Sequence, residues 1–335
     1  MRWLKRLLLL LAVLVIVYLL GPHPAEPVYT NTLPELPAID SLDQYVHFIE
    51  SQHHLKPDNE ARIVWADSTH QVTDYAIVYL HGFSASQEEG NPAHRDIAKY
   101  FGCNLYLSRL DAHGIDTVDA LYPMTAENLW ETAKQAYAIG KKLGKKVILM
   151  GTSTGGTLAL QLAAAFPDVA GLILYSPNIA INDPNAWLLN KPWGLQIARL
   201  VKKSDYNTAS WNTPLYNQYW NRKYRLEAAV QLQELLETTM TKTTFAAIHQ
   251  PVLTLCYYKD EQHQDPVVKV SAMRTMLQEL GTPAAEKKLV PIPNAGAHVL
   301  GSPIQSKDVA GVERETKLFL EKTMHLKPIP NTRPL

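Results

Sequence analysis

Short apolar runs alternate with longer amphipathic stretches along most of the chain, and this alternation is the strongest constraint on its fold. The apolar runs are aliphatic or β-branched with little polar alternation, which is typical of strands buried on both faces. They lie at residues 62–66, 75–80, 104–110, 146–150, 171–175, 252–258 and 287–291. Stretches with helical spacing separate them, at residues 93–101, 126–143, 156–166, 268–280 and 309–324. The pattern predicts an α/β fold with a mostly parallel central sheet and helices on both faces.

One long interval, residues 178–250, does not fit the alternation, and we interpret it as an inserted helical cap. Residues 226–236 have the spacing of an amphipathic helix. Residues 187–224 of the interval are rich in aromatic residues, which predict an apolar and mostly neutral entrance to a binding site. These residues are Trp187, Trp193, Tyr206, Trp211, Tyr216, Tyr219, Trp220 and Tyr224.

Charge and cysteine content exclude several classes of protein. The 335 residues contain 32 Lys and Arg against 32 Asp and Glu, so the chain lacks the excess of positive charge that draws in nucleic acid. No nucleic-acid partner is predicted. Cys103 and Cys256 are the only cysteines and form no CxxC pair. The sequence therefore predicts neither a zinc site nor a disulfide-stabilised small scaffold.

The N-terminal segment has the pattern of a membrane-targeting sequence. Arg2, Lys5 and Arg6 precede an uncharged run at residues 7–20, and a proline-rich stretch follows. No clear cleavage site and no nearby lipid-accepting cysteine follow the run, which favours an uncleaved transmembrane anchor over a cleaved secretion signal. The basic residues predict that the rest of the chain lies outside the cytoplasm, which in a bacterium is the periplasm.

The stretch from Gly151 to Gly155, GTSTG, joins a predicted strand to a predicted helix. In such a G-x-S-x-G turn the small residues let strand and helix approach closely, and the serine adopts a strained conformation that exposes its hydroxyl. The N-terminus of the following helix then lies beside any negative charge that develops there. The pattern predicts that Ser153 is a nucleophile.

A second motif, His81-Gly82-Phe83, follows the predicted strand at 75–80. A loop in this position supplies a backbone N–H group to an oxyanion hole. We expect the N–H groups of Phe83 and Thr154 to be the two donors. The imidazole of His81 is expected to fix the loop without taking part in the chemistry.

A serine nucleophile needs a histidine base and an acid that orients it. His298 is the strongest base candidate because it lies in a loop of small residues after the last strand and before the final helix. Two aspartates could be the acid. Asp265 precedes an apolar pair that must pack inward, and it is favoured over Asp260, which lies closer to the strand end. The acidic residues and His263 of this loop lack a second set of ligands, so no metal is predicted.

Together, the HGF loop, the GTSTG turn, the DPVV segment and the GAHVL segment resemble the α/β-hydrolase superfamily, especially its monoacylglycerol lipase and serine aminopeptidase-like carboxylesterase branch. The resemblance covers roughly residues 61–325. It implies an α/β-hydrolase fold, a triad of Ser153, Asp265 and His298, a cap over the site and no cofactor. The strand order of such a fold also separates Cys103 from Cys256, so that both are expected to be free thiols.

These observations predict a serine hydrolase that cleaves a small acyl ester or lipid-like substrate through an acyl-enzyme. A small-peptide or amide hydrolase and a catalytically inactive binding protein of the same fold are the alternatives. The expected organisation is an N-terminal anchor or signal at 1–27, a linker at 28–60, a hydrolase core at 61–177 and 251–327, and the cap at 178–250.

Overall fold

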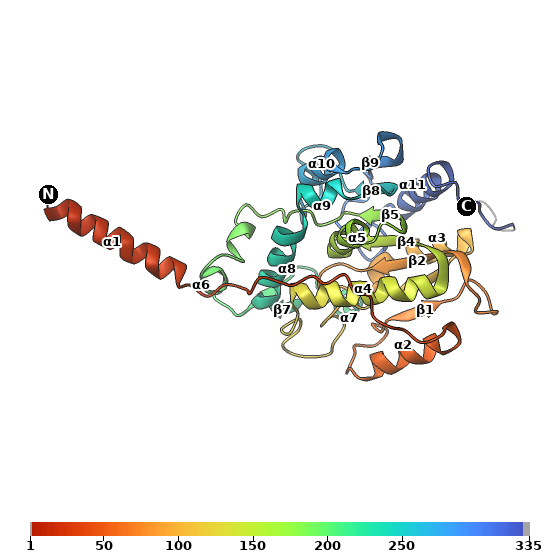
Figure 1. Cartoon of the computed structure of the whole chain (residues 1–335), viewed down its shortest axis with the longest axis horizontal. Coiled ribbons are helices and arrows are strands. Elements are labelled where there is room, and N and C mark those ends of the chain that lie inside the picture. Colours follow the sequence, from red (N-terminus) through yellow and green to blue (C-terminus); the bar gives the residue numbers. More distant parts are fainter. Residues whose placement is uncertain (1, 331–335) are drawn as a thin grey trace.

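A seven-stranded sheet forms the centre of the computed structural model, which describes residues 2–330 (Figure 1). Its order is β1-β3-β2-β4-β5-β8-β9; β1 pairs with β3 in antiparallel fashion and all other neighbours are parallel. The strands are β1 (Arg62–Val64), β2 (Thr73–Leu80), β3 (Asn104–Leu107), β4 (Gly144–Thr152), β5 (Val169–Tyr175), β8 (Val252–Cys256) and β9 (Lys287–Pro291). The predicted α/β fold with a mostly parallel sheet is confirmed.

Helices cover both faces of this sheet because its strands carry apolar side chains on both faces. In β2, Ala76 and Val78 belong to one buried cluster, and Ile77 and Tyr79 belong to another on the opposite face. The first cluster includes residues of α4 (Ala126–Leu143), α5 (Thr154–Ala165) and α10 (Val270–Glu279). The second includes residues of α3 (Ala93–Phe101) and α11 (Val309–Lys322). The strands therefore lie between two layers of helices.

Several smaller elements lie between β5 and β8, in the interval that the sequence predicts to be a cap. They comprise α6 (Gly194–Lys202), β6 (Tyr206–Thr208), α7 (Pro214–Tyr219), β7 (Lys223–Arg225), α8 (Leu226–Thr239) and α9 (Lys242–Ala246), together with a short 3-10 turn, Ala186–Leu188. Strands β6 and β7 form an antiparallel pair of their own. This interval is therefore a partly helical addition to the central sheet.

The segment at 28–60, interpreted from the sequence as a linker, contains the helix α2 (Leu42–Ser51) and a 3-10 turn, Ile39–Ser41. Leu42, Val46 and Glu50 are buried at a spacing of four residues, so one side of α2 packs against the body. Glu50 also accepts a hydrogen bond from Arg109 Nε at 2.7 Å. This part of the chain is therefore packed against the body.

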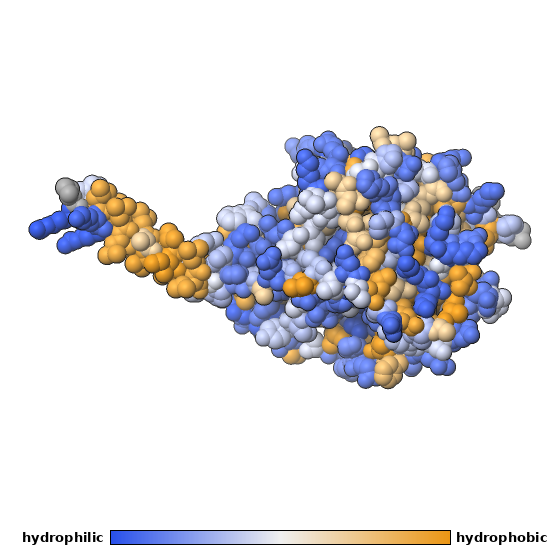
Figure 2. All heavy atoms as spheres, in the orientation of Figure 1, coloured by the Kyte–Doolittle hydropathy of each residue, from blue (hydrophilic) through white to orange (hydrophobic). Residues whose placement is uncertain are grey.

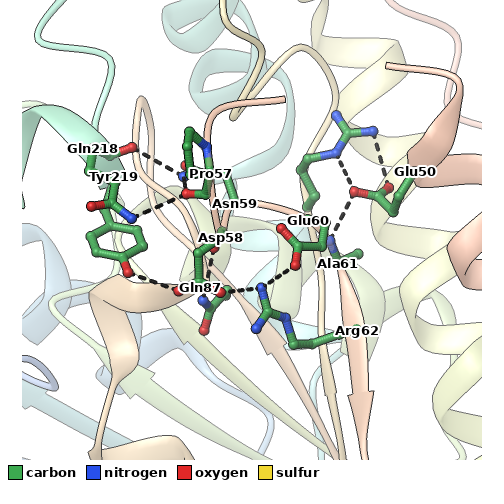
Figure 3. Close-up of polar contacts among 11 residues, drawn as sticks. Glu50, Pro57, Asp58, Asn59, Glu60, Ala61, Arg62, Gln87, Gln218 and Tyr219 are labelled. Atoms are coloured by element: carbon green, nitrogen blue, oxygen red, sulfur yellow. Dashed lines mark hydrogen bonds and ion pairs between the residues drawn. The ribbon is translucent and has the colours of Figure 1, made fainter. Parts of the chain in front are cut away.

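Polar contacts from the segment after α2 hold α7 against the body (Figure 3). The Asn59 side chain donates to Gln218 O at 3.1 Å, and the Tyr219 hydroxyl donates to Asp58 at 2.8 Å. Lys56 Nζ donates to the carbonyl groups of Asn217 and Trp220 near the end of α7. These bonds fix the orientation of α7.

The N-terminal helix α1 (Arg2–Leu19) projects away from the body, and its surface is apolar beyond the basic first turns (Figures 1 and 2). No helix in the described part of the chain is long and apolar enough to cross a membrane. The reason lies in α1 itself, because Arg2, Lys5 and Arg6 occupy its first turns. The uncharged remainder would span only ~20 Å, against ~30 Å of hydrocarbon. The predicted membrane anchor, and the membrane-anchored extracytoplasmic location based on it, are therefore wrong.

Cys103 and Cys256 are both free and buried, which confirms the predicted pair of thiols. Burial raises the pKa of each thiol to about 12, so almost none of the reactive thiolate forms at neutral pH. We expect the native protein to react slowly with iodoacetamide and the denatured protein to take up two equivalents without prior reduction. Intact-mass measurement checks this. Uptake that requires a reductant would instead mean a disulfide.

Candidate active site

Ser153 lies in the turn between β4 and α5, and its backbone has the strained geometry expected of the G-x-S-x-G pattern. Its φ and ψ angles are 53° and −117°. The two glycines of the motif are sterically required, because a Cβ on Gly155 would collide with the carbonyl of Leu80, and one on Gly151 with the backbone of Gly155. The packing of strand against helix thus holds Ser153 in a conformation that few residues adopt.

His298 and Asp265 form a buried hydrogen-bonded pair. The distance from His298 Nδ1 to Asp265 Oδ2 is 2.7 Å, so the carboxylate accepts the Nδ1 proton and leaves Nε2 as the second ring nitrogen. The other carboxylate oxygen accepts the backbone N–H groups of Val267 and Val268 at 2.8 and 3.1 Å. Asp265 has no further freedom to turn away from the imidazole.

This pairing shifts the pKa of both groups. Burial opposes ionisation of Asp265, but the charge and hydrogen bond of His298 and the two backbone N–H groups outweigh it and lower the pKa of the carboxyl. Burial likewise acts against protonated His298, and the negative charge and hydrogen bond of Asp265 outweigh it, raising the pKa of the imidazole. A histidine of this kind readily takes up a proton from a neighbouring hydroxyl.

The alternative acid, Asp260, lies elsewhere. Lys259 and His263 hydrogen-bond to close a turn beyond β8, and Asp260 is at its exposed end, where it binds His263 Nδ1 at 2.8 Å. The chain then returns, and the N–H of Asp265 donates to Tyr257 O at 3.0 Å. The loop after β8 therefore forms a surface turn at Asp260. Asp265 follows this turn and lies back at the end of β8.

The HGF loop is held in place by two buried histidines. His81 Nε2 accepts the N–H of Leu110, and His113 Nε2 accepts the N–H of Ser84, each at 3.0 Å. Accepting these bonds requires neutral rings, and burial lowers the pKa of both, to about 4 for His113. The expected role of His81 as a loop anchor agrees with these contacts, whereas sequence reasoning missed His113 as its partner.

The HGF loop brings Phe83 close to Ser153, whose other expected oxyanion donor, Thr154, is the next residue in the chain. A Cβ placed on Gly82 would lie 3.1 Å from Ser153 Cβ, so the loop passes directly over the serine. The N–H of Phe83 makes no hydrogen bond to any described residue. Thr154 is the first residue of α5, where a helix leaves its N–H groups without intrahelical acceptors. Both N–H groups remain candidates for holding an oxyanion.

Ser153 and His298 open into one cavity of about 890 Å³ between the sheet and the elements of the cap interval. Its walls are mainly apolar. Four of the aromatic residues expected at the entrance line it, namely Trp211, Tyr216, Trp220 and Tyr224, with Ile197 and Val201 of α6 and Leu226 and Leu232 of α8. The other four are not among the lining residues; Tyr219, for instance, binds Asp58.

One acidic residue in the cavity was not found by sequence reasoning. Glu89 lines the cavity with only 2% of its surface exposed. It belongs to no recognisable motif, since two adjacent glutamates in a loop normally indicate a solvated surface. Among residues 2–330, no three His, Cys, Asp or Glu side chains converge in a way that could hold a metal ion.

The comparison with known families adds to this geometry. The model of a family described as "Alpha/beta hydrolase family" matches residues 77–313, which is most of the chain. The chain belongs to this α/β-hydrolase family. The family resemblance inferred from the sequence is thus confirmed at the level of the superfamily. The match spans the HGF loop, the serine turn, the acid loop and the histidine segment of this family member.

Solved structures show the same fold at low sequence identity. A structure of the metagenome-derived lipolytic enzymes LipS and LipT has a TM-score of 0.62 and 17% identity, covering 80% of this chain and 99% of that one. The monoacylglycerol lipase of Paleococcus ferrophilus has a TM-score of 0.57 and 14% identity, covering 78% and 98%. Est1E of Butyrivibrio proteoclasticus with bound ferulic acid has a TM-score of 0.55 and 18% identity, covering 79% and 95%. No match is found among curated protein sequences.

Proposed function

We propose that this protein is a serine hydrolase that cleaves carboxylic esters through an acyl-enzyme at Ser153. The observation that supports this most strongly is the buried His298–Asp265 pair opening into the same cavity as the strained serine turn. A general base, its orienting acid and a nucleophile are the three groups that acyl transfer requires.

The proposed reaction has two halves. Ser153 Oγ attacks the ester carbonyl carbon while His298 Nε2 accepts the hydroxyl proton, and the carbonyl oxygen becomes an oxyanion held by the N–H groups of Phe83 and Thr154. The intermediate collapses, the bond to the alcohol breaks, and His298 returns its proton to the alcohol oxygen. Water then repeats these steps on the acyl-enzyme and releases the carboxylic acid. Asp265 stabilises the imidazolium in both halves.

The cavity supports a substrate with an uncharged, largely apolar acyl group. Its volume of about 890 Å³ is within the range of small-molecule sites, and aromatic and aliphatic side chains dominate its walls. A short- or medium-chain carboxylic ester or a monoglyceride fits this description. The names of the structural neighbours, two lipolytic enzymes and a monoacylglycerol lipase, support the same class of substrate.

Turnover of p-nitrophenyl esters of rising acyl length tests the proposal. We expect kcat/KM to rise from acetate toward medium chains, since each methylene that the cavity buries contributes about 0.8 kcal/mol. An aminoacyl p-nitroanilide of similar size is the matched amide, and its turnover is expected to be much slower. Faster amide turnover would favour a peptidase. No turnover, together with no labelling by a fluorophosphonate, would indicate an inactive binding protein.

A further inference from the structure

Glu89 lies beside the reacting groups without belonging to the triad. Its Oε2 accepts the N–H of Gly82 at 2.5 Å. A Cβ placed on Gly82 would lie 2.9 Å from both carboxyl oxygens of Glu89 and 3.1 Å from Ser153 Cβ. The carboxyl group therefore touches the loop that carries Phe83 and is a close neighbour of the serine.

The loop that carries His298 also packs against the segment of Glu89. A Cβ placed on Gly301 would lie 3.1 Å from Cα of Gly90, and the N–H of Ala93 donates to Gly301 O at 3.4 Å. The charges of Glu89 and His298 each shift the titration of the other. Glu89 thus belongs to a segment that contacts both the HGF loop and the loop of His298, whereas Asp265 binds His298 directly through Nδ1.

Three other titratable groups around Glu89 are neutral near pH 7. Tyr79 of β2 and Tyr216 of α7 both feel its charge, and burial raises the pKa of each, to about 12 for Tyr216. His94 of α3 packs against Gly90, and burial lowers its pKa to about 3. His298 is therefore the cation that acts on Glu89.

Burial raises the pKa of Glu89 to about 7, against the opposing effects of the Gly82 hydrogen bond and the charge of His298. The charge of ionised Glu89 in turn contributes to the raised pKa of His298, after the larger contributions of Asp265. The negative charge of Glu89 and the positive charge of His298 thus favour each other.

We propose that Glu89 is a positioning residue of the active site. Its carboxyl group fixes Gly82 of the HGF loop, and its negative charge favours the protonated form of His298. This rests on the function proposed above. Ionised Glu89 keeps His298 protonated to higher pH, and a protonated imidazole cannot accept the Ser153 proton. On the acidic side, kcat/KM rises with pH as His298 loses its proton, and we call this rise the acid limb. It therefore lies at higher pH in wild type than in a variant without the charge of Glu89.

Two substitutions separate the two roles. Glu89→Gln keeps an oxygen for the Gly82 N–H but removes the charge, so plateau activity is expected to stay within about threefold. Near pH 7, where Glu89 ionises in wild type, the variant should be closer to its plateau activity than wild type is. Glu89→Ala leaves the Gly82 N–H without its acceptor and should lower plateau kcat/KM by about 10- to 100-fold.

Glu88→Gln is the matched control, because Glu88 is the adjacent carboxyl, binds Asn91 and does not line the cavity. Its pH profile is expected to match that of wild type. The loop-anchoring role is overturned if Glu89→Ala keeps its plateau activity. The charge role is overturned if the pH profiles of Glu89→Gln and wild type coincide.

NMR titration supplies a readout that requires neither turnover nor a folded variant at Glu89. With ¹³C-labelled glutamate carboxyls in unmodified protein, we expect one side chain to titrate near neutral pH, and titration of every glutamate near pH 4 would contradict the expected onset of the Glu89 effect near pH 7. Where Glu89→Gln folds, its His298 imidazole should lose its proton at lower pH than in wild type. Absence of ester turnover in wild type, with these titrations as expected, would refute the hydrolase and leave the coupling of Glu89 to His298 in place.

Discussion

Replacing Ser153 with alanine is expected to lower ester turnover by about six orders of magnitude, the loss typical of a serine nucleophile in a triad. Fold stability should hardly change. The Ser153 hydroxyl donates no hydrogen bond to another described residue, and the strained backbone is imposed by the packing of β4 and α5. Its removal should therefore alter the free energy of unfolding by no more than ~0.5 kcal/mol.

Steady-state kinetics and fluorophosphonate labelling measure this loss. Ser271→Ala is a suitable control, because Ser271 is an exposed serine on α10, away from the cavity. Wild type and Ser271→Ala should both take up one label, and Ser153→Ala should take up none. A Ser153→Ala variant that keeps a tenth of wild-type turnover would refute the assignment of the nucleophile.

Local patterns were sufficient to predict much of the fold. The helices expected at 93–101 and 126–143 coincide with α3 and α4, and the strand at 287–291 coincides with β9. Both helices have strong end signals. Gly102 ends α3 in the left-handed conformation, and the Thr125 side chain caps α4 by accepting the N–H of Asn128. Periodicity and end signals agree there, which is why the boundaries were predictable.

Contacts between distant segments were harder to predict from the sequence. His113 reaches the HGF loop only because β2 and β3 are parallel neighbours whose carboxyl ends lie at the same edge of the sheet. Glu89 reaches Gly82 because a short turn folds back over the loop. Neither residue has a spacing that indicates these partners. The prediction of an N-terminal membrane anchor was wrong for another reason, because Arg2, Lys5 and Arg6 lie within the helix and leave an uncharged remainder too short to cross the hydrocarbon layer.

The largest remaining expectation concerns the acid. Asp265→Asn should lower kcat by about 10⁴, because an amide can present an N–H to His298 Nδ1 and so favour the wrong tautomer of the imidazole. The buried carboxylate accepts two backbone N–H groups, and asparagine retains one oxygen for them. Circular dichroism should therefore show an intact fold. Asp260→Asn is the matched control, because Asp260 is exposed and binds only within its own surface turn.

The pH dependence of the residual activity makes this comparison sharper. Asp265 contributes most to the raised pKa of His298, so without its charge the imidazole should lose its proton at lower pH. The acid limb of Asp265→Asn is then expected below that of wild type, while Asp260→Asn should keep the wild-type limb. Kinetics at saturating ester from pH 5 to 8 measure both effects. A large deficit in Asp260→Asn with a nearly normal Asp265→Asn would mean that the strand-proximal aspartate moves to His298 in solution and that the acid is Asp260.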